Sequence, residues 1–417
     1  MSPLPHWRRN INLFLGGQLL SGITTMIVQY AIIWYLTKQT GSATILSLAT
    51  LVGMLPMVLL SPFVGGFIDR THKKRLLIGA DWVVAAFALA LFFVGHDQFP
   101  LWLVFVSLAM RAIAQTFQMP TIQSLMPTLV PEVELTRING QLGMVQSANM
   151  LIAPALGAFL FSLVDIRWLI LLDVLGAALG TLMLLPVRIP HRPAADAGTP
   201  VWQDTKAGFT MLRRRRGLWA ITVLGMAFTL VFMPAASLYP LMTMQHFHGS
   251  VAQAGLIEVV YSAGMLLGGA VIGLFGRWRD RMRPIIFAYL ILGVTIGASG
   301  LLPGTQKAFW WFVGLNALAG VGTPFFNTLL MAMIQQSFPP ERLGRVLGVL
   351  NALMSLTGPV GLIFAGPLAD RFGVATLFVI AGVGTLVCGA ATWLLPATRT
   401  YDQRLQAETQ QTTTQPN

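Results

Sequence analysis

The chain has 417 residues, of which 55% are hydrophobic and only 10% are charged, and its formal net charge is +12. A soluble globular protein has about 25% charged residues, so this chain has too little charge to cover apolar cores surrounded by water. The composition therefore excludes an ordinary cytosolic enzyme, and the mean hydropathy of +0.69 indicates that lipid surrounds most of the chain.

Twelve apolar runs follow one another along the chain, each near the roughly 20 residues that a helix needs to cross a bilayer. The first run is too long for the core of a signal peptide, so we expect it to remain in the mature protein. The expected spans are 11–36, 44–68, 76–95, 100–119, 138–163, 167–186, 217–243, 251–275, 285–302, 308–334, 345–369 and 374–396. These runs predict an all-α membrane protein with twelve transmembrane helices.

The distribution of positive charge predicts the orientation of the chain. Basic residues gather at 69–75, 188–216 and 277–283. If the N-terminus is cytoplasmic, the only Lys and Arg outside the cytoplasm are Lys38, Arg167, Lys307 and Arg371, apart from Arg111 within a span. Cytoplasmic loops carry an excess of Lys and Arg, so we expect both termini in the cytoplasm. The charge thus indicates topology and contact with anionic lipid, not nucleic-acid binding.

The chain also contains an internal repeat. Gly65, Asp69 and Arg70 recur at the same spacing in the second half as Gly276, Asp280 and Arg281. Six spans on each side in the same orientation are typical of two parallel repeats. We therefore predict an N-terminal six-helix bundle at 1–186, a cytoplasmic linker at 187–216, a C-terminal six-helix bundle at 217–396 and a cytoplasmic tail at 397–417. The Pro-rich linker should be irregular until an amphipathic stretch near 202–212.

The loop after the second expected span reads G-G-F-I-D-R-T-H-K-K-R. It resembles the signature loop of the major facilitator superfamily, although His72 replaces a usual glycine. Other stretches, including A-I-I-W-Y-L-T, S-A-G-M-L-L-G-G and A-D-R-F-G, resemble the macrolide-efflux permeases of that superfamily. The resemblance implies the major facilitator fold. It also implies a cytoplasmic gate formed by Asp69, Arg70, Lys73, Asp280 and Arg281.

The antiporter signature of the superfamily is partly present in the fifth expected span, as Ala-Pro-Ala-Leu-Gly-Ala at 153–158. The eleventh span carries a related Gly-Pro-Val-Gly at 358–361. Proline and small residues permit a bend and close helix contact. We therefore expect helix bends at Pro154, Gly157 and Pro359, while ordinary packing explains these residues equally well.

Ionisable residues inside spans mark candidate functional sites, because each costs roughly 2.5–3.5 kcal/mol on insertion scales. Arg111 lies near the middle of the fourth span, with Gln115 and Gln118 on the same helix face. In many antiporters of the superfamily an arginine of this span is implicated in proton coupling. By resemblance Arg111 has that role, the alternative being a structural hydrogen bond to a neighbouring helix.

Two acidic residues, Asp173 and Glu258, lie in the outer halves of the sixth and eighth expected spans. Burial favours the protonated form of a carboxyl group, so these acids can exchange a proton or bind an organic cation. The alternative for each is a hydrogen-bonded packing acid. Asp81, near the cytoplasmic start of the third span, is expected to pair with the basic loop or with a helix end.

Polar residues at helical spacing predict a substrate cavity rather than lipid-facing surfaces. Aromatic and methionine side chains would complete an adaptable apolar wall. The cavity candidates are Gln18, Thr25, Gln115, Phe232, Met233, Tyr261, Asn316, Asn327 and Asn351. Hydrogen bonding between helices is the competing explanation for the polar members.

No phosphate-binding loop, zinc-protease motif or nucleophile elbow occurs in the sequence, and Cys388 has no partner cysteine. We therefore expect no enzyme activity, no cofactor and no metal. The leading prediction is a monomeric exporter in the bacterial inner membrane that moves hydrophobic, often cationic drugs outward against protons, by alternating access. By resemblance the substrates are macrolides. Alternatives are a siderophore or lysolipid exporter, or a non-transporting membrane sensor or scaffold.

Overall fold

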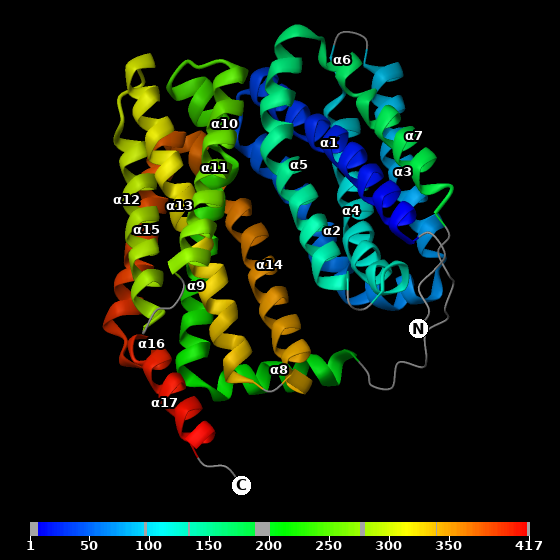
Figure 1. Ribbon diagram of the computed structural model, residues 1–417. Helices are drawn as coiled ribbons and strands as arrows, with labels where there is room; N and C mark the ends of the chain where they lie inside the picture. The colour runs from blue at the N-terminus through cyan, green and yellow to red at the C-terminus, as the bar shows by residue number, and fades with distance from the viewer. Residues whose placement is uncertain are drawn as a thin grey trace. The chain divides into compact units, whose positions relative to one another are not determined.

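The computed structural model describes residues 7–95, 98–131, 134–187, 201–275, 280–338 and 340–414. Within these ranges all regular elements are helices (Figure 1). Twelve of the described segments are long and apolar enough to cross a membrane. The prediction of an all-α membrane protein with twelve spans is confirmed. The Pro-rich part of the expected linker, 188–200, lies outside the described residues.

The first of two compact units comprises Met1–Gly41, Leu48–Ala197 and Val251–Val259. It contains most of the first six spans and the first turns of the eighth. Its helices are α1 (Trp7–Thr40), most of α2 (Ala43–Arg70), α3 (Lys73–Val94), α4 (Leu101–Leu129), α5 (Leu135–Leu163), α6 (Ile166–Leu169), α7 (Leu172–Leu184) and the start of α11 (Val251–Phe275).

The second unit comprises Ser42–Ser47, Gly198–Ser250 and Val260–Asn417. It contains the amphipathic helix expected before the seventh span, six membrane-spanning segments and the helical tail. Its helices, besides the rest of α11, are α8 (Val201–Arg214), α9 (Arg216–Ser237), α10 (Tyr239–Leu241), the π-helix η2 (Met242–His246), α12 (Met282–Leu301), α13 (Gln306–Ser337), α14 (Pro340–Phe372), α15 (Val374–Leu394), α16 (Pro396–Arg399) and α17 (Tyr401–Thr414).

Several helices differ in length from the expected spans. The fourth continues to Leu129, well past the expected end at 119, because Pro120 does not stop it. The sixth is split into α6 and α7, and Asp165 caps α6 by accepting a hydrogen bond of 2.8 Å from the Arg167 backbone N–H. The seventh changes to a π-helix near Pro240. The end of the chain is helical over 401–414.

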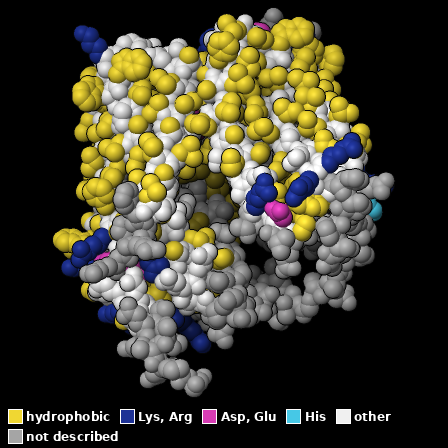
Figure 2. All heavy atoms as spheres, in the orientation of Figure 1, with side chains coloured by type: hydrophobic (Ala, Val, Ile, Leu, Met, Phe, Trp, Pro, Cys, Tyr) yellow, Lys and Arg dark blue, Asp and Glu magenta, His cyan; other side chains and the backbone are white. Residues whose placement is uncertain are grey.

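Small residues let the helices of each unit approach closely. In the second unit α12 and α15 pack side by side, and a Cβ atom at Gly382 would collide with the backbone of Gly297. Close backbone approach between small residues is a common way to pack helices in lipid. Figure 2 shows hydrophobic side chains over most of the visible helix faces, whereas the visible Lys and Arg lie toward helix ends. This distribution suits helices whose outer faces contact lipid.

Candidate functional site

Arg111 is buried within α4, where only 2% of its surface is exposed. Its guanidinium forms a two-pronged ion pair with Asp173 of α7: Nη1 donates to Oδ1 at 3.2 Å, and Nη2 donates to Oδ2. Nη1 also donates to the backbone oxygen of Thr25 in α1, at 3.1 Å. Arg111 therefore joins three helices of the first unit.

One donor of this guanidinium is not used by the described protein atoms. The Nε of Arg111 is buried and has no acceptor within hydrogen-bonding distance in the described chain. Buried polar groups almost always have a protein or water partner, and a water molecule can provide one where the site is polar. The Arg111–Asp173 pair is thus a polar centre with remaining hydrogen-bonding capacity.

Asp81 of α3 forms a second polar centre, which contacts the same helices α1, α4 and α7. Its Oδ1 accepts hydrogen bonds from Gln118 Nε2 of α4 at 2.6 Å and from Ser21 Oγ of α1 at 3.2 Å. The expectation that Asp81 pairs with the basic loop or a helix end is wrong. Lys73 and Lys74 instead donate to backbone oxygens, those of Ser124 and of Leu185 and Val187.

Two glycines of α7 allow these helices to meet. A Cβ atom at Gly176 would collide with Thr24 Oγ1, and one at Gly180 would lie 3.4 Å from Asp81 Oδ2 and 3.3 Å from the Ser21 Cβ atom. The spacing G-x-x-x-G puts both glycines on one face. Because α7 approaches α1 along this face, Asp173 reaches Arg111.

Glu258 belongs to the segment of α11 that the first unit includes. The Tyr30 hydroxyl of α1 donates a hydrogen bond of 2.7 Å to Glu258 Oε1. The Tyr30 ring stacks on Trp34, with ring centroids 5.6 Å apart. A Cβ atom at Gly255 would collide with Ala158 of α5, so α11 also approaches α5 closely here. Glu258 is half-buried and has a different partner from Asp173.

The predicted cavity residues occupy different environments. Gln115, Asn327 and Asn351 are exposed, although each lies within a span, while Gln18 and Thr25 are half-buried. Asn316 donates to its own helix, to the Phe312 backbone oxygen at 2.8 Å.

Of the remaining cavity candidates of the second unit, one stacks on another aromatic ring and one lies beside a threonine hydroxyl. Phe232 stacks on Phe228 with centroids 5.0 Å apart, and Met233 is half-buried on the same helix. The hydroxyls of Tyr261 and Thr323 lie 2.9 Å apart. The apolar wall of a substrate cavity remains a prediction for these residues.

The proline and glycine positions fall within continuous helices. Pro154 lies inside α5 and Pro359 inside α14. A Cβ atom at Gly157 would lie 3.4 Å from the Trp34 ring and 3.6 Å from the Ile27 backbone. Gly157 therefore serves close packing of α5 on α1, and bends at these positions remain predictions.

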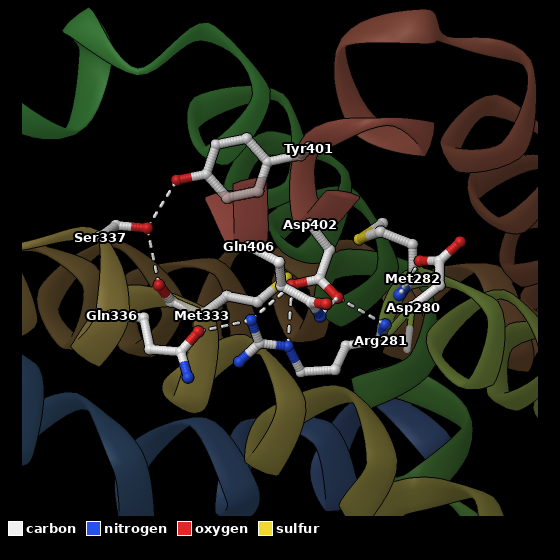
Figure 3. A network of polar contacts seen from close by, with 9 residues as sticks. All are labelled: Asp280, Arg281, Met282, Met333, Gln336, Ser337, Tyr401, Asp402 and Gln406. Carbon is white, nitrogen blue, oxygen red and sulfur yellow. Dashed lines mark hydrogen bonds and ion pairs between the residues drawn. The ribbon is translucent and has the colours of Figure 1, made fainter. Parts of the chain in front are cut away.

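The predicted gate residues are partly described. The side chains of Asp69 and Arg70 lie outside the described residues. Arg281 donates from its backbone N–H and its Nε to Asp402 of α17, at 2.7 and 2.8 Å, and its Nη2 donates to Gln336 Oε1 at 2.7 Å (Figure 3). Asp402 is fully buried. Arg281 thus ties the tail helix α17 to α12 and α13.

The tail contact is a feature that the sequence interpretation missed. Besides Asp402, the Tyr401 hydroxyl lies 2.7 Å from Ser337 Oγ, and Leu405 is buried. Buried residues at i and i+4 are the signal of an amphipathic helix, and Tyr401 and Leu405 carry it. Few apolar residues follow them, so the amphipathic signal is too short to predict a helix packed on the second unit.

The described residues contain no group of three or more His, Cys, Asp or Glu side chains arranged to hold a metal ion. Together with Glu258, the polar centres of the first unit bring one arginine and three carboxyl groups together with hydroxyl and amide donors. Such a set can hold or move a proton and can attract a charged group.

A family model described as Major Facilitator Superfamily matches residues 14–305 and, in a second alignment, residues 228–415. Macrolide efflux protein A of Streptococcus pyogenes is 35% identical over 391 residues, which cover 93% of this chain and 96% of that protein. The multidrug efflux pump Tap of Mycolicibacterium fortuitum is 24% identical, covering 94% and 96%.

Solved structures show the same fold at low identity. A bacterial homologue of the iron transporter ferroportin, in an inward-facing state, has a TM-score of 0.72 at 16% identity, covering 92% of this chain and 98% of that one. A POT family transporter in complex with 5-aminolevulinic acid has a TM-score of 0.74 at 13% identity, covering 95% and 96%.

Proposed function

Because the chain belongs to the major facilitator superfamily, with efflux proteins among its relatives, we propose that it exports macrolide antibiotics and other hydrophobic, often cationic drugs. It is a multi-pass membrane transporter of a small molecule, not an enzyme. In this proposal export is coupled to proton entry and proceeds by alternating access. The protein works as a monomer in the bacterial inner membrane, with both termini in the cytoplasm.

The observation that carries the coupling proposal is the buried Arg111–Asp173 pair. A buried ion pair is tolerable because the two charges cancel, and loss of one charge costs about 3–5 kcal/mol. When Asp173 binds a proton, Arg111 becomes an uncompensated buried cation. That state favours a conformation in which Arg111 contacts water, so proton binding changes the relative stability of two conformations.

Glu258 is the second proton or cation site of the proposal. Its carboxyl group accepts a hydrogen bond of 2.7 Å from a neutral donor, the Tyr30 hydroxyl. A carboxylate with this environment attracts a cationic drug, for which a proton can compete. The aromatic rings of Tyr30 and Trp34 beside it would contact the apolar part of the drug.

The exposed polar residues of the spans support a water-filled substrate cavity. Gln115, Asn327 and Asn351 are exposed, and polar groups within spans ordinarily face protein or water rather than lipid. The other proposed lining residues are Gln18, Thr25, Phe232, Met233, Tyr261 and Asn316. For the cytoplasmic gate we propose Asp69, Arg70 and Lys73 in the first unit and Asp280 and Arg281 in the second.

The test is erythromycin accumulation in cells that express the chain, compared with cells that lack it, before and after an uncoupler. We expect lower accumulation with the chain, and loss of the difference with the uncoupler. Unchanged accumulation would exclude the macrolide proposal. A difference that survives the uncoupler would exclude proton coupling.

Variants of the ion pair separate coupling from structural support. Asp173→Asn and Arg111→Gln each leave one charge unpaired and should abolish export, with reduced stability. The double variant Arg111→Gln, Asp173→Asn should recover stability, measured as a melting temperature in detergent, yet stay inactive. Arg137→Gln, at an exposed pair with Glu134, is the matched control and should export normally. Export by the double variant would assign the pair a structural role only.

A further inference from the structure

A cavity of about 700 Å³ lies in the second unit, between α12, α15 and the helices α16 and α17. It is separate from the polar centres of the first unit. Its apolar part is formed by Phe287 and Leu290 of α12 and Trp393 of α15, which are 61, 51 and 54% exposed. Gly389 and Ala390 of α15 contribute little side-chain volume beside them. Exposed apolar side chains of spans contact hydrocarbon, so this part of the cavity is open to lipid.

The other end of the cavity carries positive charge. Arg283, near the start of α12, and Arg399, at the end of α16, both line it and are exposed. The Arg399 guanidinium lies 5.9 Å from the centroid of the Trp393 ring. Tryptophan and arginine at a helix end are typical of the boundary between hydrocarbon and headgroups. The cavity therefore passes from an apolar surface to a cationic end.

The single acid among the described lining residues, Asp280, is already engaged. Its Oδ1 accepts from the Met282 backbone N–H at 3.0 Å, and its Oδ2 accepts from Gln403 Nε2 at 3.1 Å. Arg283 Nε lies 3.5 Å from the same Oδ2. With two arginines and one acid among the lining residues, the cavity keeps a net charge that favours an anion.

The tail network holds this end of the cavity in place. Arg281 and Asp402 form a buried ion pair, and Tyr401 contacts Ser337 (Figure 3). Asp402 follows Arg399 by three residues and precedes Gln403 directly, so its anchoring fixes both lining residues. A Cβ atom at Gly217 would collide with Ala397 and Tyr401, which shows how closely the tail also approaches α9.

We propose that this cavity binds one anionic phospholipid from the leaflet that surrounds this end of the bundle. The phosphodiester group contacts Arg283 and Arg399, and an acyl chain lies along Phe287, Leu290 and Trp393. The arginine fork suits a phosphate oxygen pair, and each basic residue near a membrane surface contributes to binding of anionic lipid. The inference goes beyond transport, since it concerns a lipid site on the outer face of α12 and α15.

The experiment measures binding of dioleoyl phosphatidylglycerol to the purified full-length protein by native mass spectrometry, with dioleoyl phosphatidylcholine as the zwitterionic comparison. We expect stronger binding of phosphatidylglycerol. Arg283→Gln with Arg399→Gln should weaken it by roughly tenfold or more, given about 1 kcal/mol per basic residue. The matched control is Arg213→Gln with Arg404→Gln, which removes two exposed charges outside the cavity and should leave binding unchanged.

A second variant tests the apolar part without altering charge. Ala390→Trp fills the cavity beside Trp393 and should reduce phosphatidylglycerol binding, while its melting temperature in detergent shows that it is folded. Equal binding of the two lipids by the unmodified protein would overturn the proposal, as would unchanged binding by both cavity variants. Displacement of the lipid by free glycerol phosphate at equal concentration would also overturn it, because the site would then recognise a small anion.

Discussion

Glu258 and Asp173 are both acids within spans, but their partners give them different chemistry. Both carboxylate oxygens of Asp173 accept hydrogen bonds from Arg111, which is always positively charged. Glu258 accepts from the neutral hydroxyl of Tyr30. A proton on Asp173 breaks a charge pair, whereas a proton on Glu258 removes a charge that can attract a drug. In the proposed exchange of a proton for a cationic drug, the two acids would therefore act at different steps.

Substitutions at Glu258 and Tyr30 should separate charge from hydrogen bonding. Glu258→Gln keeps the side-chain shape but removes the charge, so we expect loss of export. Tyr30→Phe keeps the ring on Trp34 and removes a hydrogen bond to a charged group, worth about 1.5–3 kcal/mol, so export should fall but persist. The measurement is erythromycin accumulation at matched protein levels.

Tyr35→Phe is the control for this comparison, because its hydroxyl accepts from the Phe99 backbone N–H at 3.0 Å, away from Glu258. Export by Tyr35→Phe should be close to normal. If Glu258→Gln exports as well as the unmodified protein, Glu258 has no part in coupling or cation recognition.

At the scale of elements, the position of Asp173 depends on how closely α7 approaches α1. Gly176 sits one turn after Asp173, and the space beside it is filled by Thr24. A side chain at this position must push the helices apart or displace Thr24. The ion pair is thus supported by a contact that contains no charged group.

Gly176→Ala should therefore weaken export and stability. Inserting a methyl group into a packed contact costs typically 1–3 kcal/mol, and the shift of α7 lengthens the contact between Asp173 and Arg111. Because the obstacle is the Thr24 side chain, Gly176→Ala with Thr24→Ala should recover much of both, measured as melting temperature and drug accumulation. Gly143→Ala, with nothing within 4 Å of the added Cβ atom, should be neutral. Equal defects in the single and double variants would contradict this account.

The sequence predicts the helices themselves better than it predicts the contacts between them. Twelve spans follow from apolar length alone, because lipid demands helices with internally paired backbones. The residues Arg111, Asp173 and Glu258 were found because charge within a span is costly. The sequence does not predict their partners, because helical spacing relates Arg111 only to Gln115 and Gln118 of its own helix. Which helices are neighbours depends on glycine contacts such as that of Gly176 with Thr24, and periodicity within one helix carries no such information.

The contacts of the tail helix α17 likewise cannot be predicted from the sequence. Asp402 and Arg281 are far apart in sequence, and each alone looks like a surface charge. Their pairing depends on the route of α16 and α17 across the second unit, which a single short amphipathic signal does not define. The repeat of the loop motif predicts only a gate role for Arg281. The contact with Asp402 gives Arg281 a structural role as well, because it holds the tail helix α17 on α12.

At the scale of the whole molecule, the placement of the excess positive charge, +12 in total, predicts which side of the membrane each connection faces. The positive-inside rule concerns short loops near the ends of spans, and the short connections of this chain meet that condition. The four cations predicted to lie outside are spread over four different connections, whereas most of the others lie in the clusters 69–75, 188–216 and 277–283. A reversed orientation would place the clusters 69–75 and 277–283 outside, against the electrostatic preference of the cytoplasmic leaflet.

Cysteine labelling can test this orientation, because Cys388 is buried and is the single native cysteine. In a Cys388→Ala background we expect Lys38→Cys and Lys307→Cys to react with a membrane-impermeant maleimide on intact spheroplasts, since both side chains are exposed on the predicted outer connections. Arg213→Cys and Arg404→Cys, exposed on the predicted inner side, should react only after permeabilisation. The reverse pattern would contradict the charge argument, and it would also reverse the direction in which a proton gradient drives the drug.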